Sequence, residues 1–339
     1  MLTVLENCRV SPPPSTVGER CLPLTFLDML WIRLFPIHHV FFYEFPHSRE
    51  HFLETIVPNL KHSLSITLQH FFPFAGNLIL FLNPSVEKKP EIRHVEGDSV
   101  AVTVAECTLD FNDLTGNHPR KCDMFYPLVP LLGRATKVSD YLTIPVFSVQ
   151  VTLFPNSGIS IGITNHHSLC DATTRHDFLK AWSSIAMHGT DELFLASGSL
   201  PFYERVVKYP SSFDEMALKK AGISAINADY QPRQLSLSEA VKKKNGLIED
   251  GETLIKAVFV PVPGIGVAGS TKIKIYDLDF GWGKPKKYET ISIDYRSSII
   301  SVNASKESPA DIEIGASLPA KQMDAFISIH SEELEGTFY

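Results

Sequence analysis

The chain has 339 residues, enough for one large or two ordinary domains, and 44% hydrophobic with 20% charged residues is an ordinary globular balance. A formal net charge of -7 at pH 7 argues against a nucleic-acid partner. No apolar run is long enough to span a bilayer and no basic region opens a signal peptide, so we expect no membrane association. The five cysteines are odd in number without a C-x-x-C pair, which favours reduced thiols and a cytoplasmic location.

The first 45 residues read as three short elements. The pattern predicts a strand from Thr3 to Val10, a short helix or turn over residues 22–30, and a strand over residues 38–45. A histidine pair, His38 and His39, opens the last strand. No acidic residue follows this pair at a catalytic spacing, so we interpret both histidines as structural.

A helical region is predicted next, from Ser48 to Phe72. Apolar residues recur in steps of three and four, and Pro58 suits the first turn of a second helix. Two strands then follow over residues 91–95 and 99–106, joined at Gly97 and Asp98. Three prolines interrupt residues 107–144, which we predict to be mostly loop.

The central stretch predicts a β-hairpin followed by a helix. A strand from Phe147 to Phe154 turns at residues 155–158 into a second strand, in which Ile159, Ile161 and Ile163 alternate with smaller residues. An apolar helix face and the capping Gly189 follow. The strand-to-helix turn between them carries polar groups, where rigid elements on both sides can position chemistry.

This turn holds His167 and Asp171 in the spacing H-x-x-x-D. A neutral imidazole can take a proton from a hydroxyl, and a nearby carboxylate can orient the ring or the loop. The pattern also fits a buried structural histidine, with Asp171 capping the helix through the amide of Thr173 or Thr174. A zinc site is disfavoured because only two ligands are present, so we expect no metal.

The second half is more weakly patterned. We predict a helix from Leu247 to Val258, strands from Thr271 to Phe280, Thr290 to Ile300 and Ile312 to Leu318, and a C-terminal helix beginning over Lys321 to Ser328. Asp279 to Gly283 read D-F-G-W-G and precede a short lysine-rich run.

H-x-x-x-D followed by D-F-G-W-G resembles the BAHD acyltransferases of plants. LENCRVSPPP, LPLTFLDMLWIRLFP, LKHSLSITLQHFFPFAGNL, VTLFPNSGISIGIT and IGASLPAKQMDAFISI extend the resemblance, most of all to the malonyltransferase branch, which acts on phenolic, flavonoid and anthocyanin glucosides. The resemblance implies an α/β fold of two chloramphenicol-acetyltransferase-like domains with mixed sheets flanked by helices. It implies a first domain over residues 1–190, a linker over 191–246, and a shortened second domain over 247–339.

The same resemblance implies a monomeric enzyme that uses an acyl-CoA, namely malonyl-CoA, as co-substrate and a glycoside as acceptor. His167 would be the general base and Asp171 would hold the loop, with no covalent intermediate on Ser168 or Cys170. The D-F-G-W-G segment would lie away from the chemistry and shape the CoA end, where Asp279 would form a salt bridge and Trp282 would pack. Besides these two, the implied CoA-facing residues are Gly283 and Lys284. Lys284, Lys286 and Lys287 lie either near CoA phosphates or on a solvated basic face.

Two departures from the family pattern stand out. A segment on the order of 100 residues, most of an ordinary domain, is missing between Pro232 and Leu247, together with the arginine that usually pairs with the motif aspartate. Ala172 also replaces the usual glycine. The alternative to an active acyltransferase is therefore a weak or inactive truncated isoform. A lipoyl-linked acyltransferase, which shares H-x-x-x-D, is disfavoured by D-F-G-W-G.

Overall fold

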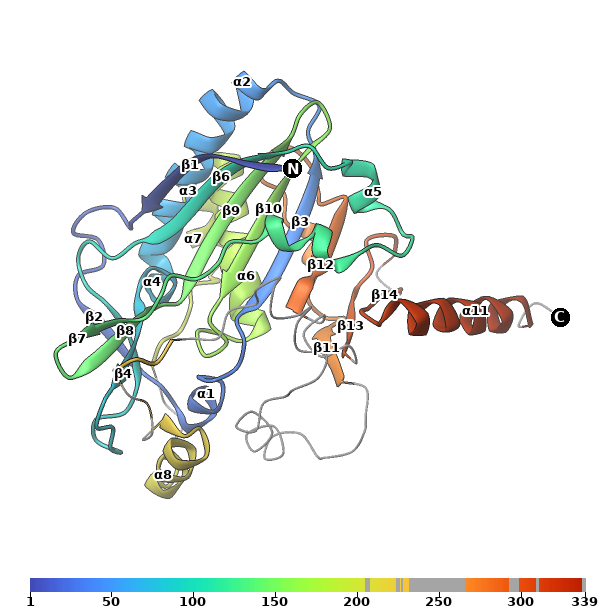
Figure 1. The fold of residues 1–339 in the computed structure, drawn as a ribbon. Coiled ribbons are helices and arrows are strands. Elements are labelled where there is room, and N and C mark those ends of the chain that lie inside the picture. The colour runs from blue at the N-terminus through green and yellow to red at the C-terminus, as the bar shows by residue number, and fades with distance from the viewer. Residues whose placement is uncertain are drawn as a thin grey trace.

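The computed structural model describes residues 1–204, 208–223, 226, 228–231, 266–292, 299–308 and 311–336. Its centre is a six-stranded mixed sheet in the order β1-β6-β9-β10-β3-β12 (Figure 1). The strands of this sheet are β1 (Leu2–Val10), β3 (Ile37–Glu44), β6 (Val100–Cys107), β9 (Phe147–Phe154), β10 (Gly158–Asn165) and β12 (Lys287–Thr290). Five of these strands come from the first 165 residues, whereas β12 comes from the second half of the chain.

The predicted hairpin is present at the centre of this sheet. Strands β9 and β10 pair antiparallel from Gly158 opposite Phe154 to Asn165 opposite Phe147. Strand β10 pairs antiparallel with β3 on its other side, and β9 pairs parallel with β6. Every residue of β9 and β10 is buried, because both faces of the sheet are covered.

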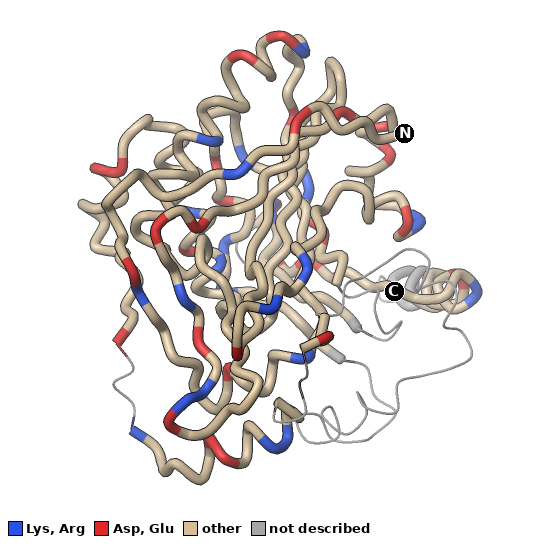
Figure 2. The backbone as a smooth tube through the Cα atoms, turned by 60° about the vertical axis from the view of Figure 1, so that its left-hand side comes forward, with Lys and Arg blue, Asp and Glu red and all other residues tan. Residues whose placement is uncertain are grey.

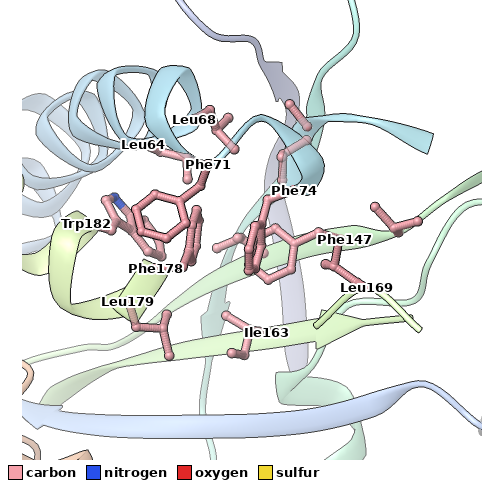
Figure 3. Close-up of a cluster of buried hydrophobic side chains, with 14 of the residues drawn as sticks. Leu64, Leu68, Phe71, Phe74, Phe147, Ile163, Leu169, Phe178, Leu179 and Trp182 are labelled. Carbon is pink, nitrogen blue, oxygen red and sulfur yellow. The ribbon is translucent and has the colours of Figure 1, made fainter. Parts of the chain in front are cut away.

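The helices α3 (Val57–His70) and α6 (Ala172–His188) cover one face of the sheet. Figure 3 shows the aromatic cluster between helices and strands, where Phe178 stacks on Phe74 at 4.1 Å and meets Phe71 edge-on at 5.5 Å. The indole nitrogen of Trp182 donates to the backbone oxygen of Leu60, 3.2 Å away. Large aromatic rings in mutual contact supply much of a core's stability.

The elements before and after these helices are short. Helix α2 (Arg49–His51) and a π-helical turn (Phe52–Ile56) lead into α3, whose first turn contains Pro58, as predicted. Helix α6 ends at Gly189, which adopts a φ of 75° as the left-handed C-cap. Four short helices complete this set: α1 (Phe26–Leu30), α4 (Phe72–Ala75), α7 (Glu192–Ala196) and α8 (Ser211–Lys220).

The opposite face of the sheet packs against the segment after β6. Helix α5 (Phe111–Thr115) and two 3-10 turns (Cys122–Met124 and Tyr126–Leu128) cover Val40 and Phe42 of β3. Gly162 of β10 is required here, because a β-carbon at this position would lie 2.0 Å from the backbone oxygen of Leu128.

A second, five-stranded sheet has the order β2-β5-β4-β8-β7. Its strands are β2 (Arg20–Pro23), β4 (Asn77–Phe81), β5 (Glu91–His94), β7 (Thr136–Val138) and β8 (Tyr141–Pro145). The prediction that residues 107–144 are mostly loop missed α5, β7 and β8. The strand pattern in the sequence is weak here, because β7 is exposed along its whole length and buried residues alternate with partly buried ones over only five residues of β8. The predicted strands β5 and β6 are present but belong to different sheets.

The third sheet lies in the second half and has the order β11-β13-β14. It comprises β11 (Gly266–Ser270), β13 (Ile299–Ala304) and β14 (Ile312–Ala316), and helix α11 (Ala320–Gly336) follows it. Strand β14 and helix α11 confirm the predictions made there. In Figure 1, α11 extends away from the rest of the chain.

One predicted strand of the second half is wrong, and another is described only in part. Residues 271–280 instead form turns and a 3-10 helix (Ile275–Asp277), held by local bonds such as the one from Ile275 N to Ile273 O. The alternating burial of Tyr276, Leu278 and Phe280 occurs here without strand pairing. The predicted strand from Thr290 to Ile300 overlaps the end of β12 and the start of β13. Residues 291–292 are a 3-10 turn, and residues 293–298 lie outside the described residues. The predicted helix from Leu247 to Val258 lies outside the described residues. No helix in the described ranges is long and apolar enough to cross a membrane.

Candidate active site

The candidate base sits in the connection between β10 and α6. The chain leaves the sheet at Asn165, and the amide of His166 donates to Val146 O at 2.7 Å, which fastens the start of the turn to the neighbouring strand. Leu169 buries its side chain in the core. Asp171 then caps α6, because its carboxylate accepts from the amide of Thr174 at 2.8 Å. The turn is thus anchored at both ends and in the middle.

His167 lies partly buried between this turn and the segment after α1. Its ring stacks on the indole of Trp31, with centroids 4.6 Å apart and planes 20° apart. The pKa of His167 is lowered to about 4, mainly by burial; a hydrogen bond from the ring to the backbone of Phe35 opposes the shift, and the charge of Arg175 adds to it. The imidazole is therefore neutral at pH 7, which is the form that accepts a proton.

The neighbouring His166 has a different environment. It is buried, and its Nδ1 lies 2.8 Å from Ser168 Oγ and 3.3 Å from the amide of Ser168. Since an amide can only donate, Nδ1 is the acceptor and its lone pair is occupied. Burial, with a smaller effect of His167, lowers the pKa of His166 to about 3. His166 is therefore a core histidine.

Asp171 is exposed, and no ion pair with it occurs in the described part of the chain. Its visible function is the helix cap, which is the simpler of the two sequence interpretations. Ala172 follows at the first helical position. Because that residue is helical, the structure needs no glycine there.

Cys170 does not behave as a nucleophile in this setting. Burial raises the pKa of its thiol to about 12, an effect that the charge of Arg175 opposes. A thiol that stays protonated at neutral pH is a poor nucleophile. Acyl transfer without an acyl-enzyme stays a prediction.

Arg175 is the site residue that sequence reasoning missed. It lies one turn after Asp171 on α6, and its charge lowers the pKa values of five groups: His39, His167, Cys170, His176 and Tyr288. The available signal was its spacing of four from Asp171, which puts both residues on the same side of α6. One cation thus lies close to groups from the turn, from β3 and from β12.

The pair His38 and His39 is buried and hydrogen-bonded, as the structural interpretation expects. His38 Nδ1 lies 2.9 Å from Thr164 Oγ1 on one face of β3. His39 Nδ1 lies 2.6 Å from the hydroxyl of Tyr288 on the other. Tyr288 belongs to β12, so this contact joins the second half of the chain to the edge of the main sheet.

The D-F-G-W-G segment forms a tight loop at the other end of β3. Asp279 Oδ1 accepts from the amides of Gly281 at 2.8 Å and Gly283 at 2.9 Å, and both glycines have positive φ of about 100°. The salt bridge expected for Asp279 is absent among the described residues, because its carboxylate holds this loop instead. Trp282 does pack, stacking on Phe280 at 5.7 Å and meeting Phe45 edge-on at 6.0 Å.

The structure does not bring this loop to His167. Tyr43 near the end of β3 donates to Leu278 O at 3.1 Å, whereas His167 follows the end of β10 that pairs with Ile37. Six strand residues at about 3.3 Å each separate these ends by roughly 20 Å. The two motifs therefore lie toward opposite ends of the same sheet.

The lysines after this loop are engaged with acidic side chains. Lys284 is 67% exposed and lies 2.7 Å from Asp277, and Lys286 lies 2.9 Å from Glu44. Lys287 pairs with Glu313. Figure 2 shows basic and acidic residues interspersed along the described chain. The pair of Lys284 fits a solvated face, whereas the side chain of Lys287 is only 13% exposed. A role of these lysines toward CoA stays a prediction. No cluster of metal ligands occurs in the described segments.

Comparisons with known proteins fit this picture. A sequence model described as the Transferase family matches residues 1–253 and 248–333. The malonyl-coenzyme A:anthocyanin 3-O-glucoside-6''-O-malonyltransferase of Dahlia pinnata is 42% identical over 450 positions, covering 98% of this chain and 98% of the relative. Phenolic glucoside malonyltransferase 1 of Nicotiana tabacum is 44% identical over 212 positions, covering 62% of this chain and 46% of the relative.

Among solved structures, vinorine synthase gives a TM-score of 0.60 at 15% identity, covering 96% of each chain. F. sporotrichioides TRI101 with coenzyme A and T-2 gives 0.57 at 13%, covering 90% of this chain and 96% of the other. Together with the mixed sheets flanked by helices, these likenesses confirm the expected fold class.

The Dahlia alignment also bears on the missing segment. It runs over 450 positions although this chain has 339 residues, so more than a hundred positions of that alignment have no counterpart here. The matches nevertheless extend through both halves of the chain and include both motifs. The chain belongs to the BAHD acyltransferase family.

Proposed function

We propose that the protein transfers a malonyl group from malonyl-CoA to a hydroxyl of a phenolic or flavonoid glucoside. The observation that carries this proposal is His167, held neutral at a strand-to-helix turn within a chain that is 42% identical to an anthocyanin malonyltransferase. The similarity to that relative extends over 98% of this chain, which supports an active enzyme over the inactive isoform.

His167 acts as the general base. It removes the proton of the acceptor hydroxyl as the oxygen attacks the thioester carbonyl of the acyl-CoA. The tetrahedral intermediate collapses, the carbon–sulfur bond breaks, and the CoA thiolate leaves and takes up a proton. General-base help of this kind contributes about 10²–10⁴-fold, and ordering the two substrates contributes much of the rest.

The backbone of Phe35 fixes the proton of His167. Its hydrogen bond raises the pKa of the ring, so the imidazole donates and a backbone oxygen accepts. One ring nitrogen thereby carries the proton, and the other keeps its lone pair for the acceptor. Asp171 contributes by capping α6 at 2.8 Å from the amide of Thr174 and so holding the turn.

Arg175 favours an acyl group that carries its own carboxylate. Its charge already acts on His167 and on the buried groups His39 and Tyr288. A malonyl group carries a negative charge that an acetyl group lacks, and a partly buried guanidinium binds a carboxylate well. This cation supports malonyl-CoA as the donor.

The CoA end of the substrate channel is proposed to lie at the D-F-G-W-G loop. Asp279 and Gly283 hold the loop, Trp282 supports it through Phe45, and the exposed Lys284 is the residue best placed to meet a phosphate. We also propose that the protein is a monomer in the cytoplasm. Its first domain covers residues 1–190, a linker covers 191–246, and the second domain covers 247–339. The missing segment would lie near the end of this linker. The two matched ranges of the family model, which meet at residues 248–253, support this division.

The test is acyl transfer by the purified chain with malonyl-CoA and a panel of flavonoid and phenolic glucosides. We expect a malonylated glucoside, and His167→Ala should lower its rate by about 10²–10⁴-fold with little change in melting temperature. Loss of activity only in step with loss of folded protein would instead favour a structural histidine.

A second comparison tests the donor. Arg175→Leu should raise the KM for malonyl-CoA by roughly tenfold or more and leave that for acetyl-CoA nearly unchanged. Arg175→Lys, which keeps the charge, is the matched control. Equal losses for the two donors would contradict a role in selecting the malonyl group.

A further inference from the structure

Trp31 lies at the C-terminal end of α1, and the residues around it differ from it in burial. Met29 and Ile32 are 0% and 1% exposed and belong to the main core. Trp31 is only partly buried and belongs to neither core cluster of the described chain. Packing in the core therefore does not explain why a large aromatic residue stands at position 31.

Its ring contact with His167 supplies that explanation. The two rings lie 4.6 Å apart and within 20° of parallel. The direction of the ring is set by the local backbone, because the amide of Trp31 donates to Asp28 O at 3.2 Å and its oxygen accepts from Leu34 N at 3.1 Å. Helix α1 is itself fixed by Thr25, whose amide and hydroxyl both donate to Asp28 Oδ2 at 2.8 Å.

We propose that Trp31 is a positioning residue for acyl transfer, which holds the His167 imidazole in one plane and shields one face of it from water. The proposal rests on the proposed function for the identity of the base, but the contact itself does not. Torsion about the bond to a histidine ring is broad, and a single hydrogen bond to Phe35 leaves the ring free to pivot about that bond. A stacked indole removes this freedom.

Shielding by Trp31 also affects protonation. Burial is the largest cause of the lowered pKa of His167, and the Trp31 ring is the stacked neighbour that covers it. The charged and titratable groups facing His167 are Arg175 on α6, which lowers the pKa, and the adjacent neutral His166. His166, with a pKa of about 3, stays neutral between pH 5 and 8, so an imidazole titration that moves toward that range when Trp31 is altered reports exposure of His167.

The test compares Trp31→Leu with Trp31→Phe. Phenylalanine keeps a ring that can stack, whereas leucine has a similar hydrophobicity without one. Phe213→Leu is the matched control. The ring centroids of Phe213 on α8 and Phe26 on α1 lie 5.2 Å apart, so this substitution should loosen α1 from α8 without changing a contact of His167. Thermal melting of all three variants checks that the fold is kept.

The first readout is the imidazole titration of His167 by NMR, assigned with His167→Gln. In Trp31→Leu we expect its pKa to rise by about one unit, part of the way back toward 6.5. Trp31→Phe and Phe213→Leu should leave it within a few tenths of wild type. An unchanged pKa in Trp31→Leu, or the same rise in Phe213→Leu, overturns the proposal.

The second readout is the rate of acyl transfer against pH. Trp31→Leu should lower kcat by about tenfold with little change in KM, and should move the acid limb of kcat/KM upward together with the NMR pKa. Trp31→Phe should restore most of kcat. Equal loss in both variants would make Trp31 a packing residue. If wild type transfers no acyl group, the proposed function fails, while the NMR titration still tests the contact.

Discussion

Aromatic side chains of the first half and apolar side chains of the second half meet very different surroundings. Phe178 and Trp182 on α6 are 0% and 1% exposed, enclosed between helices and the main sheet (Figure 3). Val267, Ile312 and Ile314 of the three-stranded sheet are 71%, 54% and 57% exposed. On α11, Phe326 is 42% exposed. The same kinds of residue are core in one region and surface in the other.

Position along the chain does not explain this difference. Tyr288 and Ile291 belong to the second half and are 5% and 6% exposed, because β12 pairs with β3 at the edge of the main sheet. Among the described residues, strands β11, β13 and β14 pair with one another and with no other strand. A sheet needs a second layer to bury its apolar face, and more than a hundred positions of the Dahlia alignment have no residues here. Burial follows the sheet that a strand joins.

The largest expected effect sets one phenylalanine against another. Phe178→Ala removes a ring that stacks on Phe74 at 4.1 Å and should lower the free energy of unfolding by about 3–5 kcal/mol. Phe326→Ala, the matched change on α11, should alter it by no more than about 0.5 kcal/mol. Urea denaturation measures both. Comparable losses would mean that α11 is as well packed as α6.

Acid should weaken the first half through its buried histidines. Burial lowers the pKa values of His38, His166 and His167 to about 4, 3 and 4, from 6.5 in the unfolded chain. The folded state thus binds fewer protons than the unfolded state. Stability is complete above pH 6.5 and falls as the pH drops toward 4, by up to about 1.4 kcal/mol per pH unit for each histidine.

This pH effect is measured by urea denaturation at intervals from pH 7.5 to pH 5. His38→Asn keeps a polar partner for Thr164 but cannot take up a proton, so its stability should depend less steeply on pH. An identical slope in the variant and wild type would show that His38 does not contribute to the acid sensitivity.

A smaller effect is expected at the cap of α6. Asp171→Ala should cost about 1 kcal/mol, because the amide of Thr174 loses its acceptor at 2.8 Å. Asp171→Asn should be nearly neutral for stability and for activity, since asparagine caps a helix as well as aspartate does. If Asp171→Asn loses most of its activity at an unchanged melting temperature, the carboxylate has a chemical role beyond the cap.

The smallest effect on folding is expected on the exposed sheet. Ile314→Lys should change the free energy of unfolding by less than about 0.5 kcal/mol, because Ile314 is 57% exposed. The same change should reduce self-association, since an apolar face and open strand edges favour it. Light scattering over a concentration series measures this. Strong destabilisation without better solubility would show that this face is covered.

Local signals in the sequence predicted much of the first half. Period-two alternation and a four-residue turn were enough for the hairpin of β9 and β10, and Gly189 with the apolar stripe before it was enough for α6. Asp171 was open to two interpretations, and the cap was one of them. These features depend on residues within a few positions of one another, so they can be predicted from a single sequence.

Contacts between distant segments were decided only by the tertiary structure. The stacking of Trp31 on His167 and the hydrogen bond between His39 and Tyr288 join residues 136 and 249 positions apart. Nothing in the periodicity of either segment specifies its partner, because packing and strand pairing depend on the whole fold. The sequence alone therefore predicted the candidate base and the elements that carry it. The folded chain decided which groups surround His167 and why its imidazole is neutral at pH 7.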